Sequence, residues 1–153
     1  MKKISIVGFG RFGKTLYRLI KDDFAIVLYN RNKIDLSTTE LTKNTIAAKD
    51  LSDVYKSDVI FYAVPISSFE EVILSHKKYF RENHLLIDVL SVKLHPAKVL
   101  TEHLKGGKTQ ALLTHPMFGA HAVPVIDVTS PAVAPFGIVT PYEDPSLILI
   151  YPT

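Results

Sequence analysis

Short apolar runs alternate with longer stretches of helical periodicity from the N-terminus to about Thr114. Each apolar run has the length of a buried strand, and the stretches between them repeat apolar residues at three- and four-residue intervals. The first such stretch places Phe12, Leu16 and Ile20 on one face. Near-continuous apolar strands that alternate with helices are typical of a parallel sheet covered on both faces. The pattern therefore predicts an α/β fold with a doubly wound, mainly parallel sheet.

The pattern also gives approximate bounds for each element. The predicted strands span 4–7, 25–29, 59–64, 85–89 and 110–114. The predicted helices span 12–20, 38–48, 67–80 and 96–105, and the last is ended by Gly106-Gly107. Seven of the nine prolines follow His115, so we expect loops there with one or two short strands, at 136–140 and 147–151. All 153 residues fit one domain.

Composition narrows the classes of function. Hydrophobic residues make up 47% and charged residues 22%, the balance of a soluble globular protein. The net charge of +3 is too small and too evenly spread to favour nucleic acid. No cysteine is present, which excludes disulfides and thiolate metal sites. With no leader pattern and no apolar run near membrane-spanning length, we expect a cytoplasmic protein without a membrane segment.

The sequence Gly8-Phe9-Gly10-Arg11-Phe12-Gly13 joins the first strand to the first helix. This is the context in which a GxGxxG motif binds a dinucleotide. Gly8 would form the tight turn, Gly10 would let the pyrophosphate approach the backbone, and Gly13 would let the helix pack on the strand. The N-terminus of the helix would then offer free N–H groups to the phosphates. A purely structural glycine turn is the alternative.

The end of the second strand distinguishes the two nicotinamide cofactors. NAD domains usually place Asp or Glu there to bind the ribose 2′-hydroxyl. This chain has Asn30-Arg31 instead, so no carboxylate would repel a 2′-phosphate, and the Arg31 guanidinium could bind one. We therefore predict NADP rather than NAD. An Arg31 that only faces solvent is the alternative.

Two further segments carry a family resemblance, Asp88-Val89-Leu90-Ser91-Val92-Lys93 and Thr114-His115-Pro116-Met117-Phe118-Gly119. Together with the glycine turn they resemble the nucleotide-binding domain of the prephenate/arogenate dehydrogenases of tyrosine biosynthesis, and in particular the NADP-using arogenate branch. The resemblance implies a Rossmann-type fold in which Val64-Pro65 also lies beside the cofactor.

The resemblance further implies an oxidative decarboxylation of a cyclohexadienol substrate. His115 matches the histidine that takes the proton of the ring hydroxyl as hydride leaves for the nicotinamide, a role suited to a base that is neutral at pH 7. Ser91 matches the serine that orients this histidine, and Lys93 is interpreted as structural or close to the cofactor. Both Ser91 and His115 follow predicted parallel strands, where open α/β sheets bind ligands. The remaining histidines are interpreted as surface residues without a metal site: His76, His84, His95, His103 and His121.

The sequence departs from the family pattern in two respects. Ala120 stands where the family has a proline, and the helical domain that follows in family members is not part of this chain. That domain dimerises, closes the substrate site and supplies an arginine to the substrate carboxylate. The segment 122–139 is apolar and weakly charged, so we expect it to dock on a second copy or on a separate helical partner.

Three functions are compatible with these residues. The first is an NADP-dependent arogenate or prephenate dehydrogenase, which Ser91 and His115 favour. The second is an NADP-binding module without turnover, which the absence of the helical domain favours. The third is a short NADPH reductase acting on imines or ketones, but no long helix with a following catalytic Lys or Asp is found in the sequence.

Overall fold

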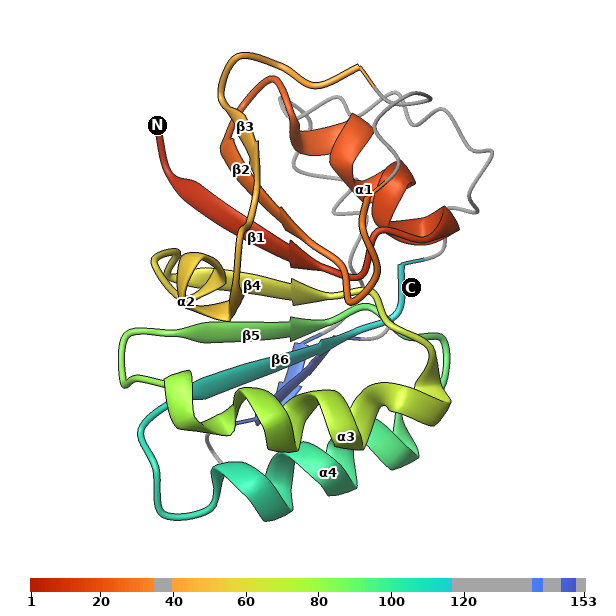
Figure 1. The fold of residues 1–153 in the computed structure, drawn as a ribbon. Helices are drawn as coiled ribbons and strands as arrows, with labels where there is room; N and C mark the ends of the chain where they lie inside the picture. The colour runs from red at the N-terminus through yellow and green to blue at the C-terminus, as the bar shows by residue number, and fades with distance from the viewer. Residues whose placement is uncertain (35–39, 117–138, 142–146, 151–153) are drawn as a thin grey trace.

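The computed structural model describes residues 1–34, 40–116, 139–141 and 147–150, and in these ranges eight strands form one sheet (Figure 1). The spatial order is β3-β2-β1-β4-β5-β6-β8-β7, and every neighbouring pair is parallel except β7 and β8. The strands are β1 Lys3–Val7, β2 Ala25–Tyr29, β3 Thr45–Ala47, β4 Val59–Tyr62, β5 Leu85–Asp88, β6 Gln110–Thr114, β7 Val139–Pro141 and β8 Leu147–Ile150. This order confirms the predicted doubly wound sheet.

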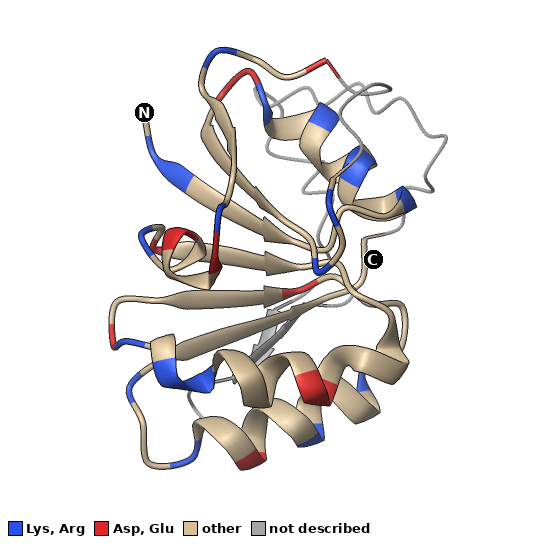
Figure 2. Cartoon of the chain, in the orientation of Figure 1, with Lys and Arg blue, Asp and Glu red and all other residues tan. Residues whose placement is uncertain are grey.

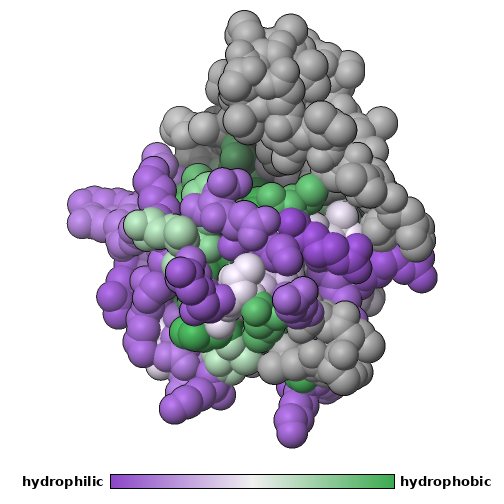
Figure 3. All heavy atoms as spheres, turned by 90° about the horizontal axis from the view of Figure 1, so that it is seen from above, coloured by the Kyte–Doolittle hydropathy of each residue, from purple (hydrophilic) through white to green (hydrophobic). Residues whose placement is uncertain are grey.

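Helices lie on both sides of the sheet. The helix α1 (Arg11–Ile20) covers one face, and α3 (Ile66–His76) and α4 (Leu94–Leu104) lie side by side on the other (Figure 1). The short α2 (Leu51–Val54) precedes β4, and one 3-10 turn (Lys77–Tyr79) extends α3. Basic residues are spread along α1, which carries no acidic residue (Figure 2). Among the described residues seen from above, most are hydrophilic, and apolar residues lie between them (Figure 3).

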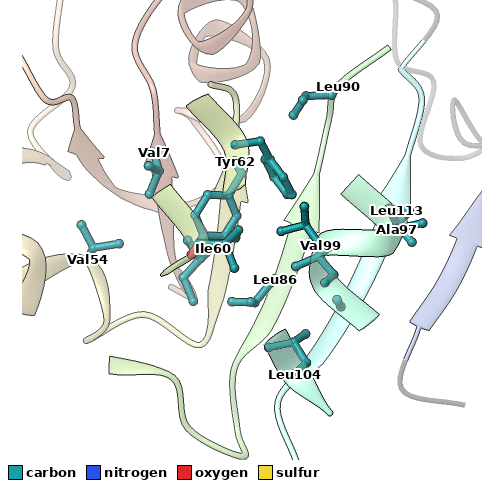
Figure 4. Close-up of a cluster of buried hydrophobic side chains, with 14 of the residues drawn as sticks. Val7, Val54, Ile60, Tyr62, Leu86, Leu90, Ala97, Val99, Leu104 and Leu113 are labelled. Atoms are coloured by element: carbon teal, nitrogen blue, oxygen red, sulfur yellow. The ribbon is translucent and has the colours of Figure 1, made fainter. Parts of the chain in front are cut away.

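Alternate residues of β1 and β4 contribute to two cores. On β1, Ile4 and Ile6 pack toward α1, whereas Val7 packs toward α3 and α4. The core on the α3 and α4 side is the larger, and side chains from β4, β5, β6 and α4 meet there (Figure 4). Ser5 also points to this side, where its hydroxyl donates to the Val54 carbonyl at 2.7 Å. The sheet is therefore buried on both faces, as near-continuous apolar strands require.

The predicted helix 38–48 is wrong wherever the structure describes it. Residues 45–47 form β3, which pairs with β2 in parallel, and 38–39 lie outside the described residues. The Tyr17 hydroxyl explains the extended course, because it accepts from the Thr42 N–H at 3.0 Å and contacts the Thr45 hydroxyl at 3.2 Å. These bonds from α1 hold the segment along the edge of β2, and no local periodicity reveals them.

The other differences are small. The predicted helix 67–80 corresponds to α3 at 66–76, and the predicted helix 96–105 corresponds to α4 at 94–104. The helix α2 was not predicted, because four residues are too few to show a period. The two late strands are β7 and β8, although 136–138 and 151 lie outside the described residues.

Two expectations concern surfaces. The proposed docking segment 122–139 lies outside the described residues except for position 139. In the described ranges, no helix has both the length and the apolar character needed to cross a bilayer.

The core on the α3 and α4 side predicts a contrast between two leucine substitutions. Leu86 of β5 is 0% exposed and Leu94 of α4 is 86% exposed. We expect Leu86→Ala to lower the free energy of unfolding by about 2–5 kcal/mol, because it leaves a cavity in a packed core. The control Leu94→Ala should change it by less than about 0.5 kcal/mol. Urea unfolding followed by circular dichroism measures both, and equal losses would contradict this description of the core.

Candidate functional site

The glycine turn after β1 is packed so tightly that two of its positions exclude any side chain. Gly8 has φ +97°, and a Cβ added to it would collide with the Ala63 carbonyl at the end of β4. A Cβ on Gly13 would collide with the Gly8 carbonyl in the same way. A Cβ on Gly10 would meet nothing within 4 Å. The turn therefore has no space for a side chain at Gly8 and Gly13, whereas the space beside Gly10 is open.

The N-terminus of α1 is directed to this open side. Gly10 is its N-cap and offers no side-chain hydrogen bond, and the first turn contains no acidic residue. The Phe9 N–H donates to the Asn30 Oδ1 at 3.1 Å, which ties the turn to the loop after β2. The Phe9 ring is buried and packs edge-on against Tyr17 at 5.9 Å. The turn thus offers the N–H groups of a helix terminus to an anion.

A cleft of about 660 Å³ lies beside the turn, at the carboxyl ends of β1, β2 and β4. It brings together most of the residues predicted to bind the cofactor: Gly8, Gly10, Arg11, Phe12, Asn30, Arg31, Val64 and Pro65. Phe9 and Gly13 do not line it; they support the turn from behind. The cleft has the place that a dinucleotide takes in an open α/β sheet.

The cleft continues past Arg31 into a second hollow of about 630 Å³. Arg31, Lys33 and Lys49 line this hollow, together with Asp50. The Asp50 carboxylate accepts from the Ser52 N–H at 2.7 Å as the N-cap of α2. Hydrogen bonds from the Ser52 side chain and main chain lower the pKa of Asp50. Three cations against one carboxylate already engaged by the backbone make this end of the cleft attractive to an anion.

A smaller cleft of about 350 Å³ brings Ser91 and His115 together. It shares Phe12, Val64 and Pro65 with the large cleft, so the two are continuous around the end of β4. Ser91 follows β5 and His115 follows β6. The Thr114 hydroxyl donates to the Asp88 carbonyl at 2.7 Å, which fixes the ends of these two strands side by side. The predicted catalytic pair is thus placed next to the predicted cofactor residues.

The loop that carries Ser91 is closed by an ion pair between Asp88 and Lys93. The Asp88 side chain is 0% exposed and that of Lys93 11%. The Leu90 N–H also donates to the Asp88 Oδ1 at 2.8 Å. Burial raises the pKa of Asp88 to about 6, although Lys93 and the Leu90 N–H oppose the shift. Burial also lowers the pKa of Lys93. Lys93 therefore has a structural role, one of the two interpretations given to it from the sequence.

Sequence reasoning missed one wall of the large cleft, which α3 supplies. Its lining residues are Ser68, Glu71, Val72, Ser75 and His76. Their spacing of three and four residues places them on one helix face, and this partly polar stripe was a signal that could have been found.

Two of the histidines interpreted as surface residues are buried. His76 is 3% and His84 2% exposed, because the aromatic rings of Tyr55 and its neighbours enclose both. His121 lies outside the described residues. In the described ranges, no group of three or more His, Asp or Glu side chains is placed to hold a metal ion.

Comparison with known proteins gives a consistent family. The model of the prephenate dehydrogenase nucleotide-binding domain matches residues 16–144. The chain is 34% identical over 125 residues to arogenate dehydrogenase 2 of Arabidopsis thaliana, covering 76% of the chain and 33% of that protein. It is 42% identical over 80 residues to a probable arogenate/prephenate dehydrogenase of Methanocaldococcus jannaschii, covering 52% of the chain and 17% of that protein. The chain thus matches a third or less of the length of these relatives.

Solved structures share the fold. Synechocystis arogenate dehydrogenase superposes with a TM-score of 0.61 at 24% identity, covering 78% of this chain and 42% of that one. An imine reductase of Myxococcus stipitatus in complex with NADP+ gives 0.61 at 16% identity, covering 77% and 42%. At these identities the likeness shows the fold alone.

The buried ion pair under the Ser91 loop predicts a large and pH-dependent loss for Lys93→Met. Without its partner, the Asp88 carboxylate would be buried and unpaired, so we expect the free energy of unfolding to fall by about 3–5 kcal/mol at pH 7. The loss should be smaller at pH 5. A carboxyl whose pKa is raised in the folded state takes up a proton there before it does in the unfolded chain, so stability recovers as the pH falls toward 4.

The matched control is Lys108→Met. Lys108 pairs with Glu82 at 3.0 Å, but the two side chains are 81% and 68% exposed. This substitution should cost less than about 1 kcal/mol at either pH. Chemical unfolding at the two pH values measures both variants, and a Lys93→Met loss no greater than the control would show that the pair does not hold the loop.

Proposed function

The chain belongs to the prephenate dehydrogenase family, and from this premise we propose that it is the NADP-binding part of a dehydrogenase that oxidatively decarboxylates arogenate or prephenate. The single observation that carries the proposal is the continuity of two clefts. One is built by the glycine turn and the other holds Ser91 and His115, and they share Phe12, Val64 and Pro65. A cofactor bound in the first would present its reactive end to a substrate in the second.

The residues present fit a dinucleotide. The open space at Gly10 and the uncapped N-terminus of α1 suit a pyrophosphate, which needs close backbone approach and free N–H donors. Val64 and Pro65, where the two clefts meet, would border the nicotinamide. Bound NADP+ would supply the acceptor for the hydride.

The preference for NADP rests on the end of β2. The Asn30 side chain is engaged with the Phe9 N–H and the Asn32 carbonyl, so it orders the loop and adds no negative charge. Arg31 borders both hollows, and Lys33 and Lys49 line the second. A 2′-phosphate placed there would meet a guanidinium and two ammonium groups, whereas a ribose 2′-hydroxyl would find no carboxylate at the end of β2.

His115 would act on the substrate as a general base. Its imidazole would accept the proton of the ring hydroxyl while the carbon that bears this hydroxyl gives up hydride. The ring carboxylate would leave as CO2, and the electron pair of the broken C–C bond would complete the aromatic ring. Ser91, on the facing loop, would orient the hydroxyl and the imidazole by hydrogen bonds.

Exposed apolar residues at the rim of the smaller cleft favour the binding of a partner there. Ile66 and Val92 border this cleft and are 40% and 51% exposed, and Leu94 nearby in sequence is 86% exposed. We propose that a second copy of the chain or a separate helical partner covers this rim and encloses the cyclohexadienol substrate.

Arg31→Ala tests the cofactor preference. We expect the Kd for NADP+ to rise by about 10- to 100-fold, because a charge-assisted hydrogen bond to the phosphate is lost, while the Kd for NAD+ changes less than about 3-fold. Arg18→Ala is the control, since Arg18 is exposed on α1 and does not line the cleft. Isothermal titration gives all the constants. Equal or tighter binding of NAD+ by the native chain would refute the NADP assignment.

His115→Asn tests the chemistry. We expect NADPH formation from NADP+ with arogenate or prephenate to fall by about 100-fold or more, with the Kd for NADP+ unchanged. His95→Asn, outside the smaller cleft, should leave the rate unchanged. Unimpaired turnover in His115→Asn would remove His115 from this role. Tight NADP+ binding by a native chain that shows no turnover would support the binding module instead.

A further inference from the structure

Three buried side chains form a hydrogen-bonded row beneath the large cleft. The Tyr62 hydroxyl lies 2.6 Å from the Tyr55 hydroxyl, which lies 2.7 Å from the His76 Nδ1. Tyr62, Tyr55 and His76 are 1%, 4% and 3% exposed. They come from β4, the end of α2 and the end of α3, so the row joins three elements of the fold. Neither the glycine turn nor the Ser91 and His115 pair uses it.

The positions of the protons in this row follow from counting donors. Within the described part of the chain, the Tyr62 hydroxyl has one partner, the Tyr55 oxygen. If His76 carried its proton on Nδ1 and donated to Tyr55, then Tyr55 would donate to Tyr62, and the buried Tyr62 proton would have no acceptor. If Tyr62 instead donates to Tyr55 and Tyr55 donates to the His76 Nδ1, both hydroxyl protons are used. The row therefore runs from Tyr62 to His76.

This direction fixes the tautomer of His76. With Nδ1 accepting, a neutral imidazole carries its proton on Nε2. Burial lowers the pKa of His76 to about 4, so the ring is neutral near pH 7. His76 thus has an Nε2–H donor that the Tyr55 bond does not occupy.

That donor is open to the large cleft. His76 lines the cleft, and no hydrogen bond from the described residues engages its Nε2. The buried side-chain atoms without a partner in the described ranges are Thr101 Oγ1 and His103 Nε2, so the His76 Nε2 is not sealed in the core. The neighbouring lining residues Leu51 and Val72 are apolar. Polar Ser68, Glu71 and Ser75 line the same α3 face. Apolar side chains beside a fixed N–H donor suit a flat ring that carries acceptor nitrogens.

We propose that His76 is a specificity-determining residue that donates its Nε2–H to a ring nitrogen of the adenine of the cofactor, with Tyr55 and Tyr62 as positioning residues that fix its tautomer. This inference rests on the proposed binding of NADP to the cleft. Gly10 and Arg31, the proposed phosphate-binding residues, line the same cleft as His76. The ring of Tyr29, directly before Asn30 and Arg31, packs against the His76 ring with 6.0 Å between the centroids. The unprotonated ring nitrogens of adenine only accept hydrogen bonds, which matches a donor held in one tautomer.

The first experiment uses adenosine 2′,5′-bisphosphate, the adenosine half of NADP, and its 1-deaza, 3-deaza and 7-deaza analogues. Each analogue replaces one acceptor nitrogen by C–H. For the native chain we expect one of the three to bind about 3- to 10-fold more weakly than the parent, as the loss of one hydrogen bond predicts, and the other two to bind within about 2-fold. Equal binding of all four compounds would overturn the proposal.

Variants assign the discrimination to the row. In His76→Phe all four compounds should bind within about 2-fold of one another, because the ring remains but the donor is lost. His84→Phe is the matched control: His84 also packs on Tyr55, at 5.5 Å, but does not line the cleft, so discrimination should persist. Discrimination that survives in His76→Phe would overturn the assignment.

A measurement on the native chain needs no substitution in the core. The 15N shifts of the His76 ring at pH 7 should show Nε2 protonated and Nδ1 unprotonated, and Tyr55→Phe should increase the share of the other tautomer. A proton on Nδ1 in the native chain would refute the direction of the row. Failure of the parent bisphosphate to bind would refute the proposed function and this inference together, whereas binding that Arg31→Ala weakens, without discrimination among the analogues, would refute this inference alone.

Discussion

The contact of three backbones at the end of β1 governs the arrangement of the site. At Gly8 the chain turns with a positive φ directly against the Ala63 carbonyl of β4, and at Gly13 the first turn of α1 rests on the Gly8 carbonyl. No side chain fits between these segments, so β1, β4 and α1 approach as closely as their main chains allow. The direction of α1, the position of its first N–H groups and the position of Val64 beside the turn all follow from this approach. The clefts are what remains open around it.

The local pattern of apolar residues is sufficient to predict a strand where most of its side chains are buried. The strands β1, β2, β4, β5 and β6 are mostly apolar runs of buried or half-buried residues, and such runs can be recognised one at a time. The strand β3 could not be recognised in this way. Of its three residues only Thr45 is buried, and its extended course depends on bonds from Tyr17, which lies 28 residues earlier. The helix predicted over 38–48 on the basis of an N-cap at Ser37 or Thr38 was therefore the wrong element.

The site shows the same division. The glycine turn, Arg31, Ser91 and His115 can be predicted as candidate site residues, because each follows a predicted strand or belongs to a short motif. A lone histidine on a helix has no local feature that indicates burial, so the sequence predicts a surface position for His76, which the structure shows to be buried. Its environment is made by Tyr55 and Tyr62, which are 21 and 14 positions away in the chain. Polar groups whose partners lie in other elements have to be found in three dimensions.

The ion pair below the Ser91 loop also has a consequence for how this sequence can diverge. Asp88 and Lys93 are both largely removed from water, and each neutralises the other. A lineage that replaces either residue first must pass through an ancestor with an isolated buried charge, whereas the double replacement by neutral residues avoids that charge. Substitutions at the two positions are therefore coupled. Among descendants of this chain the two residues should be retained or exchanged together, even though neither lines the cleft in which chemistry is proposed.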